Sequence, residues 1–233
     1  MQRCYGAGMS RLSVFKIAPL LILVIVLSCS SSEEDGKIIL APAPTVVVPD
    51  NYTKFTDESE SFSIHYPNHW YTESSQLEDL EEWVNQSLSS KIPDADLSAT
   101  NMFLMAGESD ELGELNPNVN ALIERVPKNI TVEEYAEGAI ASSRATFDSL
   151  QLYSQQPVTL GGVSAYMFES SFELSEAGLD ATGRFRAFQV AIKNPGEGIV
   201  WVVTCGFVTP NPPPGASETC NTVVRSSQLL QKD

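Results

Sequence analysis

The chain has 233 residues, of which 30 are acidic and 14 are lysine or arginine, and its formal net charge is −16 at pH 7. A negative field of this sign disfavours binding to nucleic acids and to anionic lipid headgroups, and it promotes solubility. We therefore expect no nucleic-acid partner, and we interpret the acidic surface as a source of solubility rather than as a trap for cations.

An apolar run near the N-terminus predicts where the protein works. Residues 17–29 read IAPLLILVIVLSC, and the basic residues Arg11 and Lys16 precede them. The run is shorter than the roughly 20 residues that a membrane-spanning helix needs. It fits the apolar core of a signal peptide, which is followed by small residues at the cleavage site.

The end of this run, Val26-Leu27-Ser28-Cys29, resembles a bacterial lipobox, although Leu27 stands where a small residue is more usual. We therefore predict a lipoprotein signal peptide over residues 1–28 and a diacylated Cys29, carrying fatty acids such as palmitate, as the new N-terminus. Two alternatives stay open: cleavage of an ordinary secretory signal near Ser28, and an uncleaved anchor.

The start of translation is also open, because Met9 would give a more compact signal than Met1 and would discard Cys4. Removal of residues 1–28 takes away three of the 14 basic residues and none of the 30 acids, so the mature charge becomes −19. We expect the mature protein in the cell envelope, held by the lipid on Cys29 at the extracytoplasmic face of a bacterial membrane.

Residues 29–50 predict a tether, because serines, acids and an Ala-Pro-Ala-Pro segment favour an extended chain. The apolar triplets at 38–40 and 46–48 are candidates for edge strands. Residues 51–233 suit one domain with a core of its own.

The cysteines favour one disulfide. Cys4 leaves with the signal and Cys29 would carry lipid, so Cys205 and Cys220 remain as a pair outside the reducing cytosol. The alternative is that Cys205, which lies in an apolar run, is only a small buried hydrophobic residue.

The first half of the domain shows both helical and strand periodicity. Phe62, Ile64 and Tyr66 alternate with polar residues before Pro67, which predicts a half-buried strand and a turn. Leucines and a valine then recur at helical spacing and predict a helix over 76–89. Two further strands are expected, at 102–107 and 119–126.

The clearest predicted helix begins at Thr131, whose hydroxyl can accept from the backbone N–H of Glu134 while that carboxylate returns the bond. Apolar residues from Val132 to Leu150 then fall on one face. The sequence therefore predicts a long amphipathic helix here.

The second half predicts an antiparallel meander and a closing helix. The four strand candidates are 151–159, 164–173, 183–193 and 198–208. Gly161-Gly162 and Asn194-Pro195-Gly196 supply turn chemistry. The continuous apolar run from Ile199 to Thr204 predicts a central strand buried on both faces. The inward-facing residues of the closing helix should be Cys220, Val223, Val224 and Leu230.

These elements define an α+β fold in which helices flank an antiparallel sheet, an α/β/α sandwich. Residues 62–70, FSIHYPNHW, resemble the opening of PsbP-like domains, and the order of the later segments TVEEYAEGAI, AYMFESSFEL, RAFQVAI and IVWVVTC agrees. The resemblance covers roughly residues 50–230 and implies a bacterial lipoprotein member of that family. It also implies non-enzymatic work, such as stabilising or assembling a membrane complex, but no metal-binding or partner-binding residue can be matched to a position here.

The two histidines offer a weak metal site. His65 and His69 bracket Pro67, and Asp57 or Glu58 could supply a carboxylate. No second cluster of possible ligands supports a metal site. Both histidines are better explained as exposed residues at the end of a strand. We therefore predict no metal ligand and no cofactor.

No catalytic set is visible in the sequence. Gly162-Val163-Ser164-Ala165-Tyr166 lacks the closing glycine of a nucleophile elbow and enters a strand rather than a helix. Zinc-protease, phosphate-loop, dinucleotide and Cys-x-x-Cys motifs are absent from the sequence. We expect no catalytic residues and no enzyme activity.

The tryptophans suggest one interface candidate. Trp70, Trp83 and Trp201 should anchor core layers, although Trp83, on an acidic helix, would mark a binding surface if it is exposed. Our leading hypothesis is a non-catalytic, lipid-anchored extracytoplasmic domain that binds or stabilises a protein or envelope component. The alternative is a small-molecule or metal-ion carrier that uses a groove between sheet and helices; an unrecognised enzyme ranks third.

Overall fold

The computed structural model describes residues 46–57, 61–72, 100–108, 117–177 and 182–230. The predicted signal peptide, Cys29, the first part of the tether, the helix at 76–89 and Trp83 lie outside the described residues. Their assignments therefore stay predictions.

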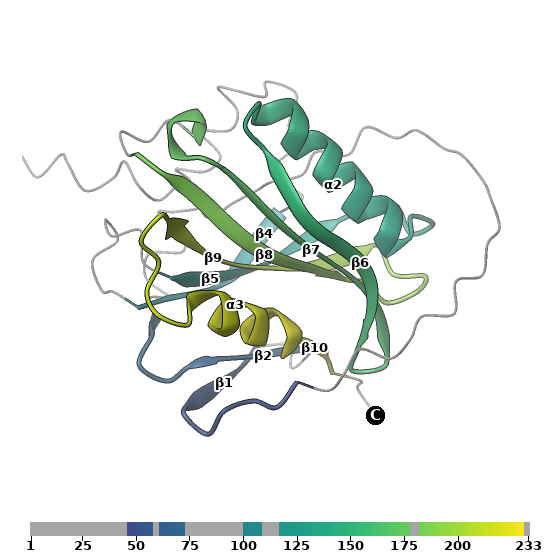
Figure 1. Ribbon diagram of the computed structural model, residues 1–233. Coiled ribbons are helices and arrows are strands. Elements are labelled where there is room, and N and C mark those ends of the chain that lie inside the picture. The colour runs from purple at the N-terminus through teal and green to yellow at the C-terminus, as the bar shows by residue number, and fades with distance from the viewer. Residues whose placement is uncertain (1–45, 58–60, 73–99, 109–116, 178–181, 231–233) are drawn as a thin grey trace, which may run out of the picture.

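A seven-stranded antiparallel sheet forms the centre of the molecule (Figure 1). Its strands, in spatial order, are β3 (Tyr71–Thr72), β4 (Thr100–Gly107), β5 (Asn118–Arg125), β9 (Ile199–Thr209), β8 (Arg184–Ile192), β7 (Val163–Glu173) and β6 (Gln151–Leu160). The predicted strands at 102–107 and 119–126 and the predicted meander are confirmed, with ends that differ by one or two residues.

Strand β9 lies in the middle of this sheet, between β5 and β8. Every residue from Val200 to Phe207 is buried, because both faces of the strand are covered. The continuous apolar run therefore identified the central strand correctly.

Helix α2 (Val132–Thr146) covers one face of the sheet (Figure 1). The predicted capping box is present: Thr131 Oγ1 accepts from the Glu134 N–H at 3.1 Å, and Glu134 Oε2 accepts from the Thr131 N–H at 2.7 Å. The buried face of α2 packs on apolar residues of β5, β7, β8 and β9. The capping box thus defines the first residue of α2, and the apolar face of the helix holds it against the sheet.

The opposite face carries a layer that the sequence did not predict in full. Helix α3 (Ala216–Arg225) lies there together with a small antiparallel sheet of β1 (Tyr52–Thr56), β2 (Phe62–Pro67) and β10 (Gln228–Leu229). The α/β/α prediction is therefore right in placing a helix on each face, and incomplete because strands share the second outer layer.

The prediction of a half-buried strand at β2 is wrong. The strand belongs to the small sheet and is buried almost throughout. The cause is its position between layers: Phe62 stacks on Trp201 of the large sheet with ring centroids 5.1 Å apart, while Ser63 on the alternate face is also fully buried.

Two further expectations are corrected near the chain ends. Leu229, in β10, is the buried leucine, and Leu230 is only partly buried. Residues 46–48 form no strand, and the Val47 side chain is 87% exposed. A single turn of 3-10 helix, η4 (Leu174–Ala177), follows β7.

Candidate functional site

His65 takes part in a backbone hydrogen bond and, among the described residues, does not belong to a cluster of possible metal ligands. His65 lies partly buried in β2, and its N–H donates to Ser226 Oγ at 2.9 Å. Burial, and then the nearby charge of Lys54, lower the pKa of His65 below its usual value. His69 lies exposed in the turn after β2.

Asp57, which the sequence suggests as a metal ligand, accepts hydrogen bonds from the backbone instead. Asp57 Oδ1 accepts from the backbone N–H groups of Ser61 at 2.8 Å and Phe62 at 2.6 Å, which ties the end of β1 to the start of β2. Among the residues that the structure describes, no three His, Cys, Asp or Glu side chains lie close enough together to hold a metal ion.

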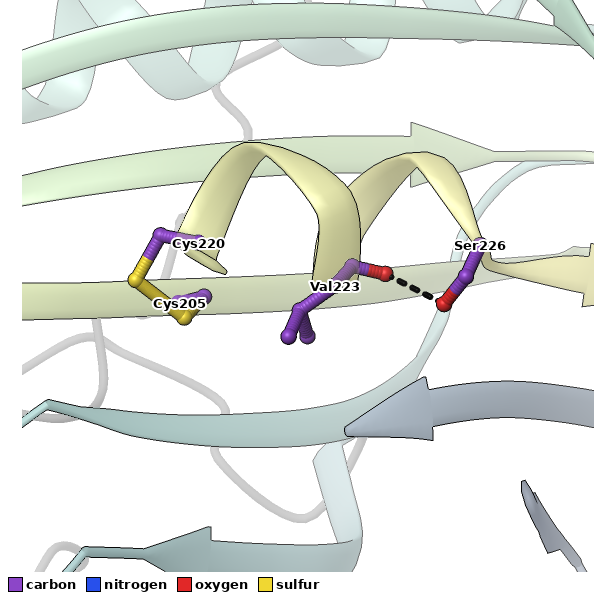
Figure 2. The surroundings of a disulfide bond; sticks show 4 residues. All are labelled: Cys205, Cys220, Val223 and Ser226. Carbon is purple, nitrogen blue, oxygen red and sulfur yellow. Dashed lines mark hydrogen bonds between the residues drawn. A yellow bond between two sulfur atoms is a disulfide. The ribbon is translucent and has the colours of Figure 1, made fainter. Parts of the chain in front are cut away.

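The two cysteines are joined in a disulfide, the pairing that the sequence predicts (Figure 2). Cys205 comes from β9 and Cys220 from α3, their Cα atoms are 5.1 Å apart, and both are fully buried. At the other end of α3, Ser226 Oγ donates to the carbonyl of Val223 at 2.7 Å. The bridge therefore holds the first half of α3 against the central strand.

The remaining sequence candidates fall into core and turn positions. Gly161 and Gly162 have φ of 56° and 83° and turn the chain from β6 into β7, so Ser164 lies on a strand after a hairpin turn. Trp70 and Trp201 are each 6% exposed and belong to the core.

A polar and aromatic surface on β6, β7 and β8 is the strongest candidate for an interface. The guanidinium of Arg186 lies 4.9 Å from the ring centroid of Tyr153 and 5.7 Å from that of Phe188. Arg186 also forms an ion pair with Glu169, to which its Nε donates at 2.6 Å. We name Tyr153, Glu169, Ser171, Arg184 and Arg186 the Tyr153–Arg186 surface.

Hydrogen bonds hold this surface in one arrangement. The Tyr153 hydroxyl and Ser171 Oγ are 3.0 Å apart, and Arg184 Nε donates to Ser171 Oγ at 3.0 Å. Arg184 also donates to the carbonyl of Ser149 at 2.6 Å. The Tyr153 side chain nevertheless remains 51% exposed. An aromatic ring and a guanidinium are thus both fixed and available to solvent.

No sequence motif joins the residues of this surface. Tyr153 and Arg186 are 33 positions apart, and the pairing of β6 with β7 shifts register at a bulge between Leu152 and Ser154. A bulge re-aims the side chains beside it. The one sequence signal for this surface is an aromatic residue, Tyr153, in the mostly polar segment QLYSQQ.

Comparisons with known proteins give a likeness of fold. No protein-family model matches the chain, and no curated protein matches it. Among solved structures, it is similar to LpqN of Mycobacterium tuberculosis, described as involved in cell envelope biogenesis, with 12% identity and a TM-score of 0.46 over 77% of this chain and 91% of that one.

Two other solved structures are similar at the same level. The Ran-binding protein Mog1p of Saccharomyces cerevisiae has 8% identity and a TM-score of 0.46 over 77% of this chain and 95% of that one. A Pseudomonas aeruginosa protein of unknown function, PA94, described as a putative regulator, has 11% identity and a TM-score of 0.41 over 78% and 99%. With TM-scores below 0.5, none of these likenesses bears on function.

In the described part of the chain, no helix is both long enough and apolar enough to cross a membrane.

Proposed function

We propose that the protein is a non-catalytic, lipid-anchored extracytoplasmic domain of the PsbP-like family that binds a protein partner through the Tyr153–Arg186 surface. The observation that carries the proposal is a half-exposed tyrosine held against an arginine that is itself fixed by Glu169. Tyr and Arg are enriched among the residues that dominate binding energy in protein interfaces.

Pre-organisation supports this role. Side chains that are already ordered lose less conformational entropy on binding. Arg186 Nε and Nη2 contact Glu169, whereas no acceptor among the described residues contacts Nη1. The side chain of Arg186 is 33% exposed. A partner that offers a carboxylate or carbonyl oxygen to Nη1 and a flat apolar group to Tyr153 would match this surface.

Among the described strands, β6 has no neighbour on its outer edge, and two features there oppose the addition of a further strand. Pro157 lacks an N–H, and the bulge between Leu152 and Ser154 interrupts the strand. We therefore expect the partner to contact side chains on the sheet face rather than to add a strand at this edge.

A capture experiment with matched tyrosines tests the interface. The tagged full chain is used to capture proteins from detergent-solubilised membranes, with Tyr153→Ala and Tyr71→Ala compared. Tyr71 is a suitable control because it is also a strand tyrosine and is 54% exposed. We expect Tyr153→Ala to lose a stoichiometric partner that Tyr71→Ala retains. Equal capture by both variants, with unchanged circular dichroism, would exclude this surface.

Lipid anchoring has its own test. A labelled fatty acid should tag the wild-type protein and the Cys4→Ala control, whereas Cys29→Ala should lose the tag and accumulate as precursor. Label that persists in Cys29→Ala would contradict acylation at this residue.

A further inference from the structure

An open pocket of about 430 Å³ lies at the N-terminal end of α2. Its walls come from the turn before α2, the first residues of β7, and the turn between β8 and β9, which meets the start of α2 in Figure 1. Ile130, Val132, Ala165 and Pro195 supply apolar surface. Because α2 and Tyr166 belong to the core on that face, the pocket lies on the opposite side of the sheet from the Tyr153–Arg186 surface.

Lys193 gives this pocket a buried positive charge. The residue lines the pocket directly after β8 and is only 5% exposed. Its Nζ donates to the carbonyl of Lys128 at 3.3 Å, and it forms no ion pair with any carboxylate that the structure describes. An ammonium group has three N–H donors, so two remain for a ligand.

Lys193 is a buried cation with no carboxylate partner among the described residues. The burial of a charge costs free energy unless an opposite charge or hydrogen bonds compensate for it. With 30 acidic residues against 14 basic ones, carboxylates are plentiful elsewhere in the sequence. An anion from solution would supply the missing compensation for Lys193.

The start of α2 adds donors to the same pocket. Val132 and Glu133 both line it, and the capping box uses only the N–H groups of Thr131 and Glu134. The first N–H groups of a helix have no acceptor within the helix, and the helix dipole favours negative charge there. The N–H groups of Val132 and Glu133 are therefore placed to bind an anion together with Lys193.

The Glu133 carboxylate limits which anion fits. Glu133 is one of the lining residues, and its charge is, after burial, the main cause that raises the pKa of the Tyr166 hydroxyl in the same wall. A second negative charge on a ligand would be repelled by Glu133. A singly charged group with an apolar body suits the walls better than a dianion.

We propose that this pocket binds a small organic carboxylate, with the carboxylate group between Lys193 Nζ and the first N–H groups of α2, and the apolar part against Ile130 and Pro195. This proposal does not rest on the proposed protein interface, because the two sites lie on opposite faces of the sheet and share no residue.

Titration of the isotope-labelled full chain with benzoate, followed by amide NMR, tests the proposal. We expect saturable shifts at Val132 and Glu133 at ligand concentrations of about 10 mM or below. Inorganic phosphate should bind less tightly. Lys193→Met, which keeps the stem and removes the charge, should weaken benzoate binding about tenfold or more. Lys54→Gln is the control, because Lys54 is an exposed lysine of β1.

A second variant tests the pocket independently if Lys193→Met fails to fold. Ser164 is exposed in the pocket wall, so Ser164→Leu should fill the space and abolish the shifts without removal of a charge. Saturable shifts that persist in both variants would overturn the proposal, as would the absence of saturation with benzoate.

Discussion

The backbone N–H of His65 donates to the hydroxyl of Ser226, 161 positions later in the chain, at 2.9 Å. Ser226 also donates to the carbonyl of Val223, in the last turn of α3. One buried serine therefore joins the end of α3 to the second strand of the small sheet, and the two ends of the domain are held together at this point.

Ser226→Ala should destabilise the domain. The substitution leaves the His65 N–H without its acceptor in a partly buried setting, which costs about 1–3 kcal/mol. Urea unfolding of the full chain measures the effect. Ser217→Ala, at an exposed position of the same helix, should change stability by less than about 0.5 kcal/mol. Similar losses in the two variants would show that the Ser226 bond contributes little.

His65 should make stability depend on pH. Its pKa is lowered in the folded protein, so the unfolded chain binds a proton more readily than the folded one. Neutral His65 therefore contributes fully to the free energy of unfolding above its unfolded pKa of about 6.5. This contribution is lost as the pH falls through the folded pKa. Between about pH 7.5 and pH 5.5, the wild type should lose more stability than His65→Gln.

Asn68→Gln controls for substitution beside β2, since Asn68 is exposed and does not titrate. It should keep the pH dependence of the wild type. If His65→Gln keeps it as well, His65 is not the group responsible.

The disulfide should be a main source of stability. It closes a loop with a sequence separation of 15, and in the chain-entropy model a loop of this size is worth about 3 kcal/mol. In a Cys4→Ser/Cys29→Ser background, thiol counting after denaturation without reductant should find no free cysteine. Cys205→Ala/Cys220→Ala should lower the free energy of unfolding by about 3 kcal/mol, and reduction of the parent should lower it by a similar amount. Two reactive thiols in the unreduced parent would refute the bridge.

Tyr135→Phe should weaken the packing of α2. The fully buried Tyr135 hydroxyl donates to Glu124 Oε2, on β5, at 2.8 Å. Loss of this buried hydrogen bond should cost about 1–3 kcal/mol, measured by thermal or urea unfolding. Tyr71→Phe removes the same atom from an exposed tyrosine and should cost less than about 0.5 kcal/mol. An equal effect at both positions would contradict the proposed role of the buried bond.

The sequence by itself determined most of the elements of the large sheet. The Thr131–Glu134 capping box, the Gly161-Gly162 turn and the unbroken apolar run in β9 each depend on residues close together in the chain. Local hydrogen bonding and hydrophobic periodicity fix such features, so they could be read before any contact was known. The cysteine pair was also predictable, because the expected signal peptide and the expected lipid on Cys29 would leave only two cysteines to pair.

Only the tertiary structure decided which elements meet. The pattern of β2 is compatible with either sheet, and its pairing with β1 and β10 depends on the packing of Phe62 against Trp201. The β6 bulge brings Tyr153 to Arg186, and the turns around Lys193 bury it at the start of α2. These sites consist of residues from separate elements, and their geometry follows from register and long-range packing, which local periodicity does not encode.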